Sequence, residues 1–182
     1  MEKHKTCSFF GHRKIDETDG LKRRLKSVIT NLIENEKVEI FLFGSRSDFN
    51  PLCHDVVTEL KIRYPQIKRL FYTCRSEMCI LEKERTYWEE VYSHFKKQPV
   101  TLLGFEEEIE HKTKYEAGKA SYVERNQAMI NDSDFCVFYY NKNYVPSTKT
   151  NSGTRIAYEY ALRKKKRIIN LFQQKTFNDN KG

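Results

Sequence analysis

At residues 6–13 the chain reads TCSFFGHR, a short apolar run that meets a glycine and then two side chains able to carry positive charge. An apolar run of this length with a glycine at its end is typical of a buried strand that turns sharply. The pattern recurs at residues 39–46, where EIFLF is followed by Gly-Ser-Arg. The sequence therefore predicts strands at Thr6–Phe10 and Glu39–Phe43.

Helical segments separate these strands. Apolar residues recur at helical spacing in Asp19–Asn35 and Pro51–Tyr64, and Ile67–Tyr72 follows as a third strand. This alternating order is typical of a parallel sheet with helices on both faces. Later segments extend the pattern, with helices expected at Tyr122–Asn131 and Gly153–Lys165 and strands at Phe135–Tyr140 and Arg167–Phe172. The predicted fold class is α/β, with a mainly parallel sheet in one domain over residues 1–182.

The middle of the chain has a weaker pattern. We expect partly helical structure at Ser76–Thr86, a short helix at Tyr87–Lys97 and a strand at Val100–Leu103. Glu106–Lys119 is polar and mixed in charge, so we expect it to cover the sheet or a ligand. The polar tail at residues 173–182 is expected to fray.

Composition favours a soluble protein with anionic partners. Of the 182 residues 32% are charged and 38% hydrophobic, and the formal net charge is +8. Such a charge suits nucleotides, nucleic acid or acidic lipid, although lysines on solvated faces serve solubility equally well. No apolar run approaches the roughly 20 residues of a membrane-spanning helix. The aromatic content of 13% leaves room for an interface in a homo-oligomer.

The five cysteines indicate reduced thiols. An odd count without a signal peptide favours a cytoplasmic protein. Cys7 and Cys136 fall in apolar runs, as small core residues do. Cys74 and Cys79 have no second pair of ligands, which a zinc site needs. We therefore expect neither a metal nor a cofactor.

Three junctions are candidate ligand-binding elements. In an open parallel sheet, ligands bind beyond the carboxyl ends of the strands, where strand order reverses. The first backbone N–H groups of a helix also attract anions. The candidate ligand-binding residues at these junctions are Gly11, His12, Arg13, Gly44, Ser45, Arg46, Ser152, Gly153 and Thr154. Ordinary turns remain an alternative at the first two junctions, with Ser47 or Asp48 capping the second helix.

Two further side chains are candidates. Arg125 and Asn126 are expected near a helix start, where Arg125 could clamp a phosphate; the alternative is a surface arginine paired with Glu124. Glu159 lies two helical turns after Ser152 and could act as a catalytic carboxylate near a sugar. Its alternative is an ion pair with Arg163, four residues on.

Four of these segments together resemble the SLOG superfamily. They are the Cys7 strand ending in Gly-His-Arg, Phe-Gly-Ser-Arg at 43–46, Glu-Arg-Asn-x-x-Met-Ile at 124–130, and Ser-Gly-Thr at 152–154. The superfamily includes the Lonely Guy phosphoribohydrolases and the Rossmann-like domain of DNA-processing protein A. The resemblance runs from Cys7 to Phe172 and is closest to small bacterial and phage-type members. It implies a Rossmann-like fold and nucleotide-derived ligands.

The sequence departs from the glycoside-cleaving members of that superfamily. Those members combine Arg-Lys-x-x-Met with Pro-Gly-Gly-x-Gly-Thr-x-x-Glu. Arg125 and Met129 match the first motif, whereas Asn126 stands in the lysine position. Gly-Thr matches in the second motif, but the glutamate position falls on Ala157, and Lys-Thr-Asn at 149–151 replaces Pro-Gly-Gly. The last helix also resembles that of nucleoside deoxyribosyltransferases, whose glutamate would likewise fall on Ala157.

Three functions follow as hypotheses. The preferred one is a module that binds or senses a nucleotide or nucleotide-derived small molecule. The alternative is an N-glycosidic-bond hydrolase or transferase acting on a nucleoside monophosphate, with Glu159 or Glu124 supplying the carboxylate. The second alternative is nucleic-acid binding, suggested by the charge and the basic run at residues 164–167. Tyr139, Tyr140 and Tyr144 could stack on a base in any of these.

Overall fold

The computed structural model describes residues 4–44, 47–74, 105–111, 114, 118–144 and 152–173. Its strands are β1 (Lys5–Gly11), β2 (Val38–Phe43), β3 (Lys68–Cys74), β4 (Glu107–His111), β5 (Phe135–Tyr139) and β6 (Arg167–Asn170). Its helices are α1 (Asp19–Glu34), α2 (Phe49–Lys61), α4 (Gly118–Asn131) and α5 (Gly153–Arg163). The described elements confirm the predicted α/β class and the order of the predicted strands and helices.

The six strands form one sheet in the order β4-β3-β2-β1-β5-β6. Every neighbouring pair is parallel. The chain builds outward from β1 through β2, β3 and β4, then returns to the other side of β1 with β5 and β6. Strand order therefore reverses between β1 and β5, and in such a sheet a crevice opens beyond the strand ends at that point.

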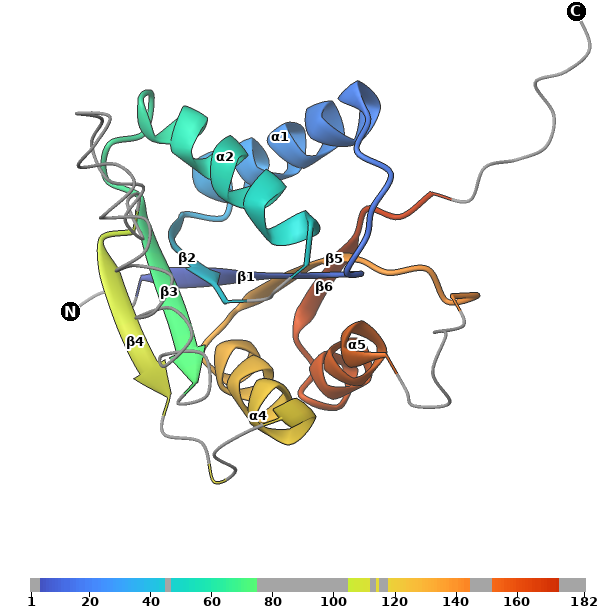
Figure 1. The fold of residues 1–182 in the computed structure, drawn as a ribbon. Coiled ribbons are helices and arrows are strands. Elements are labelled where there is room, and N and C mark those ends of the chain that lie inside the picture. Colours follow the sequence, from blue (N-terminus) through green and yellow to red (C-terminus); the bar gives the residue numbers. More distant parts are fainter. Residues whose placement is uncertain are drawn as a thin grey trace, which may run out of the picture.

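Helices cover both faces of the sheet. Figure 1 shows α1 and α2 on one face and α4 and α5 on the other. Alternate residues of β1 serve the two sides, since Phe9 belongs to the core cluster under α1 and α2 and Phe10 to the cluster under α4 and α5. This alternation follows from the two-residue period of a strand. The central strands β1 and β5 are buried on both faces, as their apolar sequences predict.

Local signals start the helices where the sequence places them. Thr18 caps α1, because its Oγ1 accepts a hydrogen bond from Leu21 N at 3.1 Å. The apolar stripe of α1, which includes Leu25 and Ile29, is buried against the sheet. Within the described residues, no helix combines the length and apolar character needed to cross a bilayer.

The strand β4 corrects one expectation. The sequence predicts that residues 107–111 belong to a polar segment covering the sheet or a ligand, yet they form an edge strand beside β3. Arg69 anchors its start, donating from Nη2 to Glu106 Oε1 at 2.7 Å. Burial alone would raise the pKa of Glu106, but the bonds from Arg69 lower it to about 2. Edge strands tolerate charged side chains, so composition hid this one. The predictions for Ser76–Thr86, Tyr87–Lys97 and Val100–Leu103 lie outside the described residues.

A close approach at the end of β1 explains the glycine there. A Cβ added to Gly11 would stand 2.4 Å from Cβ of Phe49, the first residue of α2. Phe49 is fully buried in the core, so it has little freedom to withdraw. The glycine therefore allows α2 to start against the strand end.

We expect Gly11→Ala to destabilise the protein by about 1–3 kcal/mol, the usual cost of overpacking a core. The measurement is chemical denaturation of both forms. Gly20→Ala, in the first turn of α1, is the matched control, because a Cβ there meets nothing closer than 3.6 Å. That variant should be as stable as the natural protein or slightly more so. Equal stability of the two variants would contradict the close approach.

Candidate functional site

The start of α5 lies against the end of β1. Thr154 Oγ1 donates a buried hydrogen bond to the carbonyl oxygen of Gly11 at 2.8 Å. On the neighbouring strand β5, the Tyr139 carbonyl accepts from His12 N at 3.3 Å. Two of the three predicted junctions, the first and the third, are therefore joined at the point where strand order reverses.

The first turn of α5 has the geometry of an anion site. Ser152 caps the helix, with its Oγ accepting from Arg155 N at 3.0 Å. For the N–H groups of Gly153 and Thr154, the described part of the chain offers no acceptor. A Cβ added to Gly153 would have no close neighbour within 4 Å among the described residues. Within the part of the chain that the structure describes, nothing fills the space beside these two donors at the positive end of the helix dipole.

His12 forms one wall of this region. Its ring is almost fully buried, and its Nε2 accepts a hydrogen bond from Asn141 N at 2.9 Å. Burial lowers the pKa of His12 below the ordinary histidine value. Because Nε2 is an acceptor, the neutral ring carries its proton on Nδ1. His12 therefore links the end of β1 to the turn that follows β5.

Gly44, at the end of β2, lies over a buried arginine. A Cβ added to Gly44 would stand 2.5 Å from the Tyr72 carbonyl oxygen and 3.1 Å from Cδ of Arg125. Arg125 is 2% exposed. Its Nε donates to Asn126 Oδ1 at 3.1 Å, and its guanidinium carbon lies 5.7 Å from the centre of the Tyr122 ring. The second junction is thus held beside Arg125, on the face that α4 and α5 cover.

One expectation about Arg125 was wrong. The helix α4 begins at Gly118, so Arg125 and Asn126 lie in its middle and not at its start. Arg125 is also buried, which rules out the alternative of a surface arginine. The sequence pattern missed the first turn of α4 because residues 118–121 have no apolar period.

Arg13 is exposed, and Glu159 is half-buried with a partly exposed side chain. The Arg13 carbonyl accepts from Asp48 N at 3.0 Å, but no carboxylate among the described residues pairs with its guanidinium. Glu159 Oε1 accepts from Arg155 Nε at 2.8 Å, so its ion-pair partner is Arg155 and not the expected Arg163. Ser45 and Arg46 lie outside the described residues.

Sequence reasoning missed Asn50, which ties two strand ends together. Its Nδ2 donates to the Phe9 carbonyl at 3.1 Å, and its Oδ1 accepts from Gly44 N at 3.1 Å. The side chain is buried in the first turn of α2. A polar residue at a helix start is common in sequences, so nothing local distinguishes this one.

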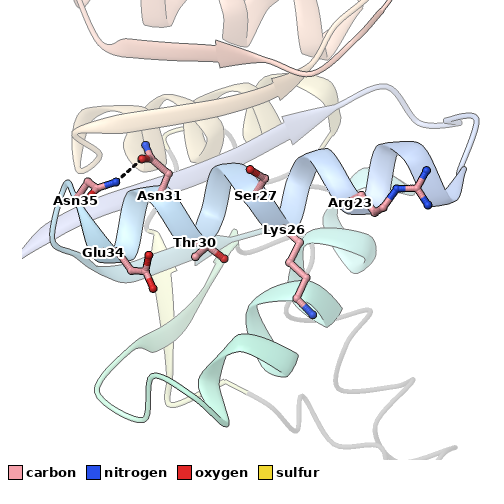
Figure 2. A pocket seen from close by; sticks show the side chains of 7 residues that line it. All are labelled: Arg23, Lys26, Ser27, Thr30, Asn31, Glu34 and Asn35. Carbon is pink, nitrogen blue, oxygen red and sulfur yellow. Dashed lines mark hydrogen bonds between the residues drawn. The ribbon is translucent and has the colours of Figure 1, made fainter.

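A shallow depression elsewhere follows the polar side of α1. Figure 2 shows its lining, which comes from α1 and the residue after it: Arg23, Lys26, Ser27, Thr30, Asn31, Glu34 and Asn35. Lys26 pairs with Glu59, and Glu34 with Arg63. The depression is therefore formed by α1, whose side chains also contact α2 and the turn after α2. None of the candidate ligand residues lines the depression.

Known proteins share this fold. The family model YpsA, described as the YspA SLOG family, matches residues 4–176. A comparison with curated proteins finds no match. Among solved structures, DNA processing protein A from Helicobacter pylori, described for its single-stranded DNA binding mode, is similar with a TM-score of 0.54. The two share 12% identity over 94% of this chain and 67% of that chain, which shows a common fold.

We expect the imidazole of His12 to titrate below about 6.5, the usual histidine value. The unfolded chain then binds this proton more readily than the folded one. The contribution of His12 to stability is therefore complete above about pH 6.5 and falls as the pH drops towards the lowered pKa. Nuclear magnetic resonance measures both the pKa and the tautomer, with His12→Gln identifying the signal. A higher pKa, or a proton on Nε2, would contradict the Asn141 hydrogen bond.

Proposed function

The chain belongs to the YspA SLOG family, and from this premise we propose that it is a binding or sensing module for a nucleotide or nucleotide-derived ligand. The phosphate binds at the start of α5, between Gly153 and the end of β1. The base and sugar extend over the strand ends. No bond of the ligand is broken in this proposal.

One observation carries the proposal: the Thr154 hydroxyl bonds to the Gly11 carbonyl at the reversal of strand order. This contact fixes the first turn of α5 over the crevice where open α/β sheets bind ligands. The N–H groups of Gly153 and Thr154, for which the described residues offer no acceptor, supply donors for phosphate oxygens. Since the side chain of Thr154 is committed to Gly11, its backbone donor is held in a fixed position for the ligand.

Positive charge supports an anionic ligand. Arg13 is exposed at the end of β1 and can approach a phosphate directly. Arg125 lies fixed beneath Gly44, where it raises the electrostatic potential at the neighbouring strand end. A hydrogen bond to a charged group contributes about 1.5–3 kcal/mol. The net charge of +8 acts in the same direction over a longer range.

Nucleic-acid binding is the second candidate, because the similar protein from Helicobacter pylori binds single-stranded DNA. The basic run at residues 164–167 gives it limited support. Lys166 Nζ donates to the carbonyls of Asn131 and Ser133, and Arg167 pairs with Glu36. Two of its four cations therefore serve the fold, and we prefer the small ligand.

We expect Gly153→Ala to weaken the binding of AMP at least about tenfold, a change of about 1.4 kcal/mol. The added Cβ meets no atom of the described residues within 4 Å, and a helical Cβ tilts towards the helix N-terminus. The methyl group would therefore occupy the approach of the phosphate without disturbing the fold. Calorimetric titration measures the affinity, and thermal unfolding verifies that stability is kept.

Gly20→Ala, the same change in the first turn of α1, is the control and should bind AMP as the natural protein does. Unchanged affinity in Gly153→Ala would remove the start of α5 from the site. If a single-stranded oligonucleotide bound while AMP did not, the second candidate would replace the first.

We expect Glu159→Gln to bind AMP with unchanged affinity, and neither form to release adenine. The reason is that Glu159 is ion-paired with Arg155, while the glutamate position of the glycoside-cleaving motif is Ala157. Chromatography of the reaction mixture over hours measures free base. Release of adenine by the natural protein that Glu159→Gln abolishes would establish the N-glycosidic alternative.

A further inference from the structure

An ordered turn after β5 presents an aromatic ring to solvent. Asn141 Oδ1 accepts from Asn143 N at 2.9 Å, and the Asn141 carbonyl accepts from Tyr144 N at 3.1 Å. Asn141 N in turn donates to Nε2 of His12. Three hydrogen bonds thus fix the backbone that carries Tyr144. Even so, Tyr144 is 48% exposed, which is unusual for a large apolar side chain in the described residues.

The ring of His12 supports Tyr144 from behind. The two ring centres lie 4.4 Å apart at an angle of 39°. His12 is itself 5% exposed and held by Asn141, so it cannot easily move away. His12 covers one side of the Tyr144 ring, and the area exposed to solvent lies on the rest of that ring. An aromatic surface held this way loses little conformational entropy on contact with a flat ligand.

This surface adjoins the proposed phosphate position. His12 directly follows Gly11, and the Gly11 carbonyl accepts from Thr154. The residue that contacts the start of α5 and the histidine that contacts Tyr144 are therefore consecutive in the chain. A ligand with an anionic group at one end and a flat aromatic group at the other matches both features. A nucleotide has this chemistry, and a sugar phosphate lacks the flat group.

The other two tyrosines of this segment are committed to the core. Tyr139 is buried, with its ring 5.8 Å from that of Phe49 and 5.4 Å from that of Phe172. Tyr140 is buried with its ring 4.8 Å from that of Tyr158. Of the three, Tyr144 alone is exposed enough to accept a base.

We propose that Tyr144, supported by His12, is the surface on which the base of the bound nucleotide stacks. This inference rests on the proposed function and narrows it: recognition requires a nucleobase, and a ribose phosphate alone is a poor ligand. Stacking is tolerant of base identity, because every base has an aromatic face. Purine and pyrimidine nucleotides should therefore both bind.

The test compares AMP, CMP and ribose 5-phosphate by calorimetric titration of the full chain. The natural protein should bind both nucleotides roughly five- to hundredfold more tightly than ribose 5-phosphate, the range that one base stack contributes. Tyr144→Ala should lose that difference and keep its affinity for ribose 5-phosphate. Tyr144→Phe, which retains the aromatic face, should bind like the natural protein. Ile62→Ala, another exposed residue just after α2, is the control for surface truncation and should change nothing.

Two results would overturn the inference while leaving the proposed function standing. One is equal affinity of the natural protein for AMP and ribose 5-phosphate. The other is AMP binding by Tyr144→Ala that matches the natural protein. If none of the three probes bound, the proposed function and this inference would fail together.

Discussion

The carboxyl end of β1 is the constraint on which the other parts of the structure depend. The Gly11 carbonyl accepts from Thr154 on the α5 side, while the Gly11 α-carbon is in close contact with Phe49 on the α2 side. The next residue, His12, bonds to the segment after β5. Since β1 is paired on both edges and buried on both faces, helices from the two layers are positioned against one fixed backbone.

Two kinds of positive charge lie at the ends of β1 and β2, and they differ in burial. Arg13 is exposed and can reorient towards a ligand. Arg125 is enclosed between α4 and the end of β2, where a charge is costly unless it is paired or hydrogen-bonded. Its contacts with Asn126 and the ring of Tyr122 supply part of that compensation. A charge held in place in this way needs no reorganisation when an anion binds nearby.

Local sequence patterns predicted most elements because periodicity and capping act over a few residues. The strands at β1, β2, β3 and β5 and the helices α1 and α5 were identified from apolar spacing and glycine positions. The strand β4 was missed, since its charged residues pair along one edge and show no apolar period. The start of α4 was missed for a related reason, as its first turn has no apolar stripe. That error placed Arg125 at a helix start, whereas it lies in the middle of α4.

By itself the sequence determined the α/β class, the strand ends marked by Gly11 and Gly44, and the start of α5 at Gly153. It also determined the resemblance to the SLOG superfamily, and the family model confirms this resemblance over residues 4–176. Each of these features depends on a short sequence motif. Only the tertiary structure decided that Thr154 bonds to Gly11 and that Arg125 is buried beside Gly44. It also decided that Glu159 pairs with Arg155 and that the ring of Tyr144 packs on that of His12. Most of these contacts join residues far apart in the chain. Their partners are therefore set by strand order and packing, which no local pattern encodes.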